Sequence, residues 1–176
     1  MASFLMFDLG KYPLIGISGK QYAGKDLLAG LIQKHWPQYQ KIPLAYAIKK
    51  AYADEQGLTL DQVEANKAQH RPGLIEKGNW GRSQDPDYWL KLVLNSQTPT
   101  IISDVRLLRE HTLLRQAGAL LIRLNADRDT RSARGQLVSE KDPTECELDE
   151  VSDWDLVLEN NQSAGELEAL LLQSLK

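Results

Sequence analysis

The chain has 176 residues, of which 42% are hydrophobic, and this is enough for a single domain with a buried core. Lysine and arginine number 21 against 24 aspartate and glutamate residues, so the net charge of −3 gives no general basic field of the kind that attracts nucleic acid. Because Cys146 is the only cysteine, the composition excludes an intramolecular disulfide and a thiolate metal cluster.

The sequence also shows no targeting signal. No apolar run approaches the ~20 residues that a membrane span needs, and the opening segment Met1–Asp8 carries an acid but no basic leader. We therefore expect one cytoplasmic domain over residues 1–176, a monomer or a homodimer, with neither a membrane nor nucleic acid as a partner.

Apolar runs alternate with helical patterns along the chain, which is typical of a mainly parallel α/β sheet with helices on both faces. Ligands of such sheets bind at the carboxyl ends of the strands. We expect five strands, at Pro13–Ser18, Lys41–Leu44, Thr100–Ser103, Ala119–Leu124 and Leu156–Glu159. We expect helices at Lys25–His35, Ala47–Gln56, Leu60–Gln69, Pro86–Leu94, Leu107–Gln116, Asp127–Arg134 and Ala164–Leu175, the last with a buried face of Leu167, Leu170, Leu171 and Leu175.

The most informative motif is the segment Gly19–Asp26, which reads Gly-Lys-Gln-Tyr-Ala-Gly-Lys-Asp between a predicted strand and a predicted helix. Glycines allow successive backbone N–H groups to face one anion, the start of the helix adds partial positive charge, and Lys25 reaches the outer phosphates. The alternative is a plain glycine turn. We predict a three-layer P-loop NTPase fold, with a nucleoside triphosphate bound by Gly19, Lys20, Gln21, Ala23, Gly24, Lys25 and Asp26.

Asp26 departs from the usual motif, because such loops place Ser or Thr there to bind Mg²⁺ with a hydroxyl group. A carboxylate at this position could hold the metal through water. It could instead cap the helix, whose first turn favours Asp.

A second candidate lies at the end of the predicted strand that begins at Thr100. P-loop enzymes hold Mg²⁺ through its water shell with an Asp at this point, so we predict that Asp104 serves the metal. Arg106 offers a planar fork suited to phosphate. The alternative is that Asp104 caps the next helix and pairs with Arg106.

Cations and aromatic rings interleave in the middle of the chain, as expected where a small anionic substrate is both paired and stacked. We predict that residues 60–95 form acceptor-binding helices. Arg71 and Arg82 are stronger evidence for this prediction than the aromatic rings are. In the structural alternative the rings are core anchors and the cations are solvated. The rings concerned are Trp80, Tyr88 and Trp89, of which Trp80 and Trp89 could stack a nucleobase.

A third cluster begins at Arg128 and precedes an acidic, polar stretch. Arg131 and Arg134 are spaced i, i+3 and share one helix face. Phosphoryl transfer spreads negative charge over the γ-phosphate oxygens, and arginines delivered by a closing loop stabilise that charge and exclude water. We predict a lid over residues 127–149 with Arg131 and Arg134 as catalytic groups. The alternative is a surface helix whose arginines pair with nearby acids.

The order of these segments resembles that of small P-loop kinases of the nucleoside monophosphate kinase type, and most closely that of animal-type phosphomevalonate kinase, from Leu14 onward. The matching stretches agree in residue type, order and approximate spacing. They are Ser18-Gly-Lys-x-x-x-Gly-Lys-Asp26, where that family also has Asp after the lysine, Lys49-x-x-Tyr52-Ala-x-Glu55-x-Gly57-Leu58, Asp85-Pro86, Ser103-Asp-x-Arg106, Arg131-x-x-Arg134-Gly135, Glu145-Cys-x-Leu-Asp149 and Asp153-Trp-Asp-x-Val-x-Glu159-Asn160.

The resemblance implies transfer of a phosphoryl group from ATP, with Mg²⁺, to the phosphate of a small phosphomonoester, giving ADP and a diphosphate. Carried over by position, the implied roles are ATP phosphate binding for Lys20, Gly24 and Lys25, metal binding for Asp104, substrate binding for Lys49, Arg71, Arg82 and Arg106, and lid action for Arg131 and Arg134.

Other functions stay open on the sequence. Phage and bacterial deoxynucleoside monophosphate kinases share much of the pattern, but they often have a His shortly before the equivalent of Glu145, where this chain has Asp142-Pro-Thr144. In the other direction, the middle cluster has fewer basic residues than a phosphomevalonate kinase usually offers. A nucleotide-binding switch or regulatory ATPase is a further alternative, although Asn66-Lys67-Ala-Gln69 lacks the closing Asp of a guanine-reading motif.

Overall fold

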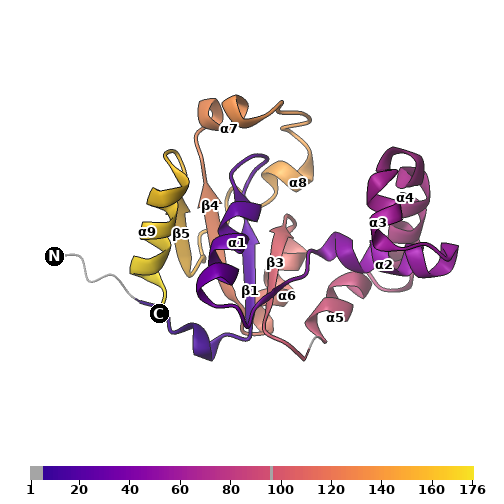
Figure 1. Ribbon diagram of the computed structural model, residues 1–176, viewed down its shortest axis with the longest axis horizontal. Coiled ribbons are helices and arrows are strands. Elements are labelled where there is room, and N and C mark those ends of the chain that lie inside the picture. The colour runs from indigo at the N-terminus through magenta and orange to yellow at the C-terminus, as the bar shows by residue number, and fades with distance from the viewer. Residues whose placement is uncertain (1–5, 96) are drawn as a thin grey trace. The chain divides into compact units, whose positions relative to one another are not determined.

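The computed structural model describes residues 6–95 and 97–176, with positions 67 and 68 described by their backbone alone (Figure 1). The first five residues of the opening segment, for which the sequence indicates no signal peptide, lie outside this description. The chain forms two compact units, one from Met1–Lys41 with Thr98–Lys176 and one from Ile42–Gln97. Within the described ranges, none of the helices has the length and apolarity required to cross a membrane.

The first unit is built on a five-stranded sheet in the order β2-β3-β1-β4-β5, and every neighbouring pair is parallel. The central strand β1 is buried along its whole length, which explains its continuous apolar sequence. The prediction of a mainly parallel, five-stranded sheet is therefore confirmed. The strands are β1 (Leu14–Ser18), β2 (Gln40–Lys41), β3 (Thr100–Val105), β4 (Leu120–Asn125) and β5 (Leu156–Glu159).

Helices cover both faces of this sheet, as predicted. Ile15 and Ile17 of β1 share one buried cluster with Leu28 of α1 and Leu171 of α9. Gly16, between them, faces the other side, where a Cβ would lie 3.1 Å from Leu114 of α6. The elements of this unit besides the strands are the 3-10 turn η1 (Leu9–Lys11), α1 (Lys25–His35), α6 (Leu108–Gln116), α7 (Arg128–Arg134), α8 (Pro143–Cys146) and α9 (Ala164–Ser174).

The second unit is helical throughout its regular structure. It contains α2 (Leu44–Gln56), α3 (Leu60–Ala65), α4 (Lys67–Gln84) and α5 (Tyr88–Leu94). A Cβ at Gly81 of α4 would lie 2.5 Å from the ring of Trp89 on α5, so the glycine lets these two helices approach closely.

Several predicted element boundaries were wrong. The helix expected at Leu60–Gln69 is two helices, because Asn66 leaves the helical region with φ −120° and ψ 36°. The 18-residue helix α4 then continues through Pro72; its high glycine and polar content concealed it in the sequence. The edge strand β2 ends at Lys41 rather than Leu44, because α2 begins three residues earlier than expected. Helix α8 was not predicted.

Candidate functional site

The carboxyl ends of the strands meet at one edge of the sheet, where the β1–α1 loop, α7 and α8 gather (Figure 1). The first unit therefore brings together the predicted phosphate loop, Asp104, Arg106, Arg131 and Arg134. The predicted substrate residues Lys49, Arg71, Arg82 and Trp80 belong to the second unit and are described separately.

The loop between β1 and α1 has the geometry of a phosphate cradle. Gly24 has φ +100°, a conformation that favours glycine, and it is the N-cap of α1. The first N–H groups of a helix have no acceptor within the helix. Within the described part of the chain, the N–H groups of Lys25 and Asp26 also have no backbone acceptor elsewhere. The loop thus presents unpaired N–H donors and the positive end of a helix to an anion.

The Lys25 ammonium group lies folded against this loop. Its Nζ donates to the carbonyl oxygens of Gly19 (2.5 Å) and Lys20 (2.9 Å). Burial, with a smaller contribution from the Arg106 charge, lowers the pKa of Lys25 to about 8, while the nearby carboxylate of Glu145 acts in the opposite direction. A bound triphosphate would place negative charge beside this buried cation and so stabilise its charged form.

Asp26 does not cap α1, so the capping alternative is wrong: the N-cap is Gly24, and no side chain caps the helix. The Asp26 carboxylate is 83% exposed and pairs with Lys41 Nζ at 2.5 Å. Its position in the first turn still suits the helix dipole. Metal binding by Asp26 through water stays a prediction.

The two arginines of α7 already contact the phosphate loop. Arg131 is only 6% exposed and its Nη1 donates to the Gln21 carbonyl oxygen at 3.4 Å. Arg134 donates from Nη1 to the Tyr22 carbonyl (3.2 Å) and from Nη2 to the Asn160 carbonyl (2.7 Å). The surface-helix alternative is wrong about the exposure of Arg131, which is buried against the loop. Its expected pairing with acids is present, because Glu140 lies 3.7 Å from Arg131 Nη2 and 2.8 Å from Arg128 Nη2.

The end of β3 holds Asp104 and Arg106. The strand extends to Val105, so Asp104 is part of it and is half-buried. The carboxylate that accepts the N–H groups of Arg106 and Leu107, at 2.8 and 3.0 Å, belongs to Glu110, whose pKa is raised by burial. The alternative in which Asp104 caps the next helix is therefore wrong, and metal binding by Asp104 stays a prediction.

Four further residues contact the loop and its neighbours, although they were not among the predicted site residues. Glu145 is buried and accepts the Gln21 N–H at 2.8 Å, and Asn160 Nδ2 donates to the Ala23 carbonyl at 2.8 Å. Only the family resemblance pointed to them. The resemblance also included Asp149, which pairs with Lys20 Nζ at 2.7 Å and with Arg123 at 3.1 Å. The fourth residue is Arg123, whose pKa is lowered by burial and whose place in an apolar strand gave no signal.

In the second unit the predicted substrate residues are mostly exposed. Lys49 pairs with Glu64, and Arg82 Nη2 donates to Asn79 Oδ1 at 2.9 Å, one turn away on the same helix. Arg71 is exposed and has no ion pair within the described residues.

The aromatic side chains divide between the two alternatives. Trp89 is 4% exposed and its Nε1 donates to the Gly78 carbonyl at 3.0 Å, so Trp89 is a core anchor. Trp80 is 45% exposed, with Lys77 Nζ 4.4 Å from its ring centroid. Trp80 therefore keeps a face that a ligand could reach.

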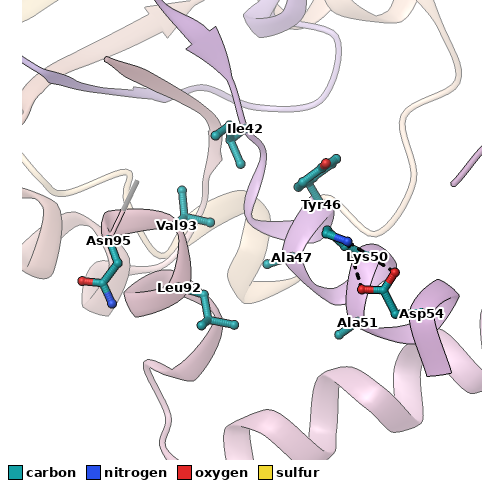
Figure 2. Close-up of a pocket in the computed structure, with 9 residues that line it drawn as sticks. All are labelled: Ile42, Tyr46, Ala47, Lys50, Ala51, Asp54, Leu92, Val93 and Asn95. Atoms are coloured by element: carbon teal, nitrogen blue, oxygen red, sulfur yellow. Dashed lines mark hydrogen bonds and ion pairs between the residues drawn. The ribbon is translucent and has the colours of Figure 1, made fainter. Parts of the chain in front are cut away.

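Figure 2 shows a pocket of about 390 Å³ between α2 and α5. Its walls are largely carbon, from residues such as Ile42 and Leu92, and its one lining cation, Lys50, pairs with Asp54 at 2.9 Å. None of the predicted substrate residues lines it. Trp80 instead lines a second pocket of about 590 Å³ beside α2 and α4, so the acceptor prediction draws no support from the pocket in Figure 2.

Comparison with known proteins then identifies the family. The sequence profile of phosphomevalonate kinases matches residues 17–118, which is more than half of the chain. This chain belongs to the phosphomevalonate kinase family. It is therefore a phosphotransferase that uses ATP and acts on a small molecule bearing a phosphate. The match spans the phosphate loop, the second unit and Arg106, and it ends before α7 and α8.

Individual proteins agree with this assignment. A phosphomevalonate kinase of Drosophila melanogaster is 29% identical over 167 residues, covering 85% of this chain and 88% of that protein. Among solved structures, TT1252 from Thermus thermophilus has a TM-score of 0.55 at 20% identity and covers 92% of this chain and 96% of its own. A shikimate kinase from Aquifex aeolicus has a TM-score of 0.53 at 13% identity, with coverage of 90% and 93%. These two likenesses support the predicted P-loop kinase fold alone.

Proposed function

We propose that this member of the phosphomevalonate kinase family transfers the γ-phosphoryl group of ATP to the phosphate of phosphomevalonate. The family match over residues 17–118, which includes an intact phosphate loop, is the observation that carries the proposal. An oxygen of the acceptor phosphate attacks the γ-phosphorus and forms a new P–O bond. The bond from that phosphorus to the β–γ bridging oxygen breaks, and ADP leaves. No strong general base is required, because the acceptor oxygen is already anionic.

On the donor side, the backbone N–H groups at the start of α1 and the Lys25 ammonium group bind the ATP phosphates. Arg131 and Arg134 stabilise the charge that spreads over the γ-phosphate oxygens, and residues 127–149 act as the lid. Their contacts with the loop carbonyls support this role, since groups that are already in place need little reorganisation during transfer.

The residues present fit Mg²⁺, a hard cation that prefers carboxylate and water oxygens. Asp104 lies near the end of β3, beside the end of β1, where Ser18 is opposite Val105. We propose that Asp104 holds Mg²⁺ through water, with Asp26, which pairs with Lys41, as a second candidate. The metal would supply neutralising charge to the transferring phosphates.

On the acceptor side, Arg106 provides a planar fork for the acceptor phosphate from the sheet edge. Residues 60–95 supply the remaining acceptor contacts in the proposal. The exposed guanidinium groups of Arg71 and Arg82 support it, since neither has an ion pair within the described residues and a phosphate can reach both. Lys49 would have to exchange its ion pair with Glu64 for the phosphate. These contacts are assigned to Lys49, Arg71, Arg82 and Trp80.

A coupled assay of ADP release tests the acceptor. The panel contains phosphomevalonate and each nucleoside and deoxynucleoside monophosphate, with ATP and Mg²⁺ at saturation. We expect turnover with phosphomevalonate only. Turnover of a deoxynucleotide would favour the second candidate, for which the exposed face of Trp80 offers a stacking surface. ADP release that no acceptor increases would indicate a regulatory ATPase instead.

Two properties remain predictions from the sequence. The cytoplasmic location rests on the single cysteine, and the oligomeric state, monomer or homodimer, is a question for light scattering. We likewise keep the prediction that nucleic acid is not a partner, which the net charge of −3 supports.

A further inference from the structure

The carboxylate of Glu145 joins two loops that follow neighbouring strands of the sheet. Glu145 lies on the four-residue helix α8, and its side chain is 3% exposed. One carboxylate oxygen, Oε2, accepts the backbone N–H of Gln21 at 2.8 Å. The other, Oε1, accepts Arg106 Nη1, also at 2.8 Å. Gln21 belongs to the phosphate loop after β1, whereas Arg106 follows β3, so a single buried group fixes both.

Both contacts are strong by their chemistry. They are charge-assisted hydrogen bonds at short distances, and burial keeps water from competing with them. The Arg106 side chain is 36% exposed and, within the described part of the chain, Nη1 is its one side-chain hydrogen-bonding atom in use. The other N–H groups of the guanidinium therefore stay available to an anion while one end is held.

We propose that Glu145 is a positioning residue that couples the phosphate loop to Arg106. It would thereby fix the separation between the groups that bind the donor phosphates and the group that meets the acceptor phosphate. The inference rests on the proposed function, in which Arg106 binds the acceptor. In-line transfer requires both phosphates within a narrow range of distance and angle, so loosening this tie slows the chemical step more than it weakens ATP binding.

Two other roles for Glu145 predict different results. If its carboxylate competed with the ATP phosphates for the Gln21 N–H group, removing its charge would raise both ATP affinity and kcat/KM. If Glu145 only stabilised the fold, removing its charge would lower the melting temperature and leave kcat and KM unchanged in the folded protein.

The first experiment compares Glu145→Gln with Glu147→Gln. Glu147 is a matched control, because it lies in the same segment and its carboxylate also accepts a backbone N–H, that of Leu108 at 2.7 Å. We expect Glu145→Gln to lower kcat by about 10- to 100-fold, with the KM for ATP within about threefold of the wild type. Glu147→Gln should stay within about twofold for both constants, as expected of a surface substitution. A raised KM with unchanged kcat, or a gain in kcat/KM, would overturn the proposal.

The second experiment is a double-mutant cycle with Arg106→Gln. If Glu145 acts through Arg106, the double variant should be no more than about threefold slower than Arg106→Gln alone, because the second substitution has little left to disrupt. Losses that multiply would show that Glu145 acts independently of Arg106, and the coupling would be rejected.

A third measurement does not depend on turnover. The wild-type amide proton of Gln21 should resonate downfield and exchange slowly, because it donates to a buried carboxylate. In Glu145→Gln it should move upfield and exchange faster, whereas Glu147→Gln should leave it unchanged. If no acceptor is phosphorylated, the proposed function fails, but this measurement still tests whether Glu145 holds the phosphate loop. An unaltered Gln21 amide in Glu145→Gln would show that Glu145 does not hold the phosphate loop.

Discussion

In the first unit Lys25, Arg131 and Arg134 all donate to backbone carbonyl oxygens of the phosphate loop. In the second unit Arg82 reaches only the neutral amide of Asn79, and Arg71 has no ion pair within the described residues. Groups that are held before the ligand arrives are suited to stabilise a transition state. Groups that become ordered only with the ligand mainly contribute to binding and lose side-chain entropy when they bind.

The difference teaches which kinetic constant each unit should control. Substitutions in the first unit should lower kcat, and substitutions of the exposed cations in the second unit should raise the KM for the acceptor. The predictions below test this division, beginning with the largest expected effect.

Lys25→Ala should reduce turnover by on the order of 10³-fold or more, because the phosphate loop loses the cation that follows the transferring charge. The fold should persist, since within the described residues the Lys25 side chain donates only to loop carbonyls, and its burial disfavours its charge. The coupled assay and calorimetric ATP binding measure the two effects, with circular dichroism as the control for folding. Unchanged turnover would show that the loop does not hold the triphosphate.

Arg134→Ala should lower kcat by on the order of 10²-fold and change the KM for ATP much less, if Arg134 meets charge that develops in the transition state. Ser132→Ala is the control on the same helix, because its exposed hydroxyl donates to the Asp129 carbonyl one turn earlier. A variant in which only the KM for ATP rises would make Arg134 a ground-state binder, and the division between the units would not hold for the lid.

Arg82→Ala should raise the KM for the acceptor by about tenfold while kcat and the KM for ATP stay close to the wild type, since a lost phosphate contact is worth roughly one charge-assisted hydrogen bond. Lys91→Ala is a matched control in the same unit, because Lys91 is an exposed cation that pairs with Asp85. Steady-state kinetics at varied acceptor concentration measures the effect. If kcat fell instead, Arg82 would belong with the held cations of the first unit.

The same contrast explains how far the sequence could be interpreted. The sheet was predictable, because its strands are buried on both faces and so appear as continuous apolar runs. The phosphate loop was predictable because its glycines and lysine are adjacent in the chain. The extent of helix α4 was not, although helices were expected within residues 60–95, since glycines such as Gly81 that serve close packing weaken the helical pattern.

The missed site residues depend on tertiary contacts. Nothing local separates Glu145, which folds back onto Gln21 and Arg106, from its exposed neighbour Glu147. Arg123 lies in a strand whose apolar neighbours dominate the pattern. A charge that is buried by residues distant in the sequence leaves no periodic signal. The family resemblance could therefore point to Glu145 where residue spacing could not.

The smallest expected effect is a pH dependence that separates activity from stability. In the free enzyme the pKa of Lys25 is about 8, so kcat/KM for ATP should fall by about twofold between pH 7 and 8 and more steeply above pH 8. The descending limb of kcat should lie at higher pH, because bound phosphates favour the ammonium form. Stability should change in the opposite direction. The pKa in the folded state lies below the ordinary value of 10.5, so between about pH 8 and 10.5 the unfolded chain binds more protons and the contribution of Lys25 to stability rises with pH.

Two variants test whether Lys25 is the group that titrates in the descending limb of the pH profile, and whether its neighbours in the site shift its pKa. The Arg106 charge lowers the pKa of Lys25 and the Glu145 charge raises it. Arg106→Gln should therefore move the limb of kcat/KM to higher pH and Glu145→Gln to lower pH, while Glu147→Gln leaves it in place. Shifts in the same direction for the first two variants would mean that another group titrates. Opposite shifts would show that the cation of the phosphate loop senses both members of the Glu145–Arg106 pair, as expected if they lie in one site.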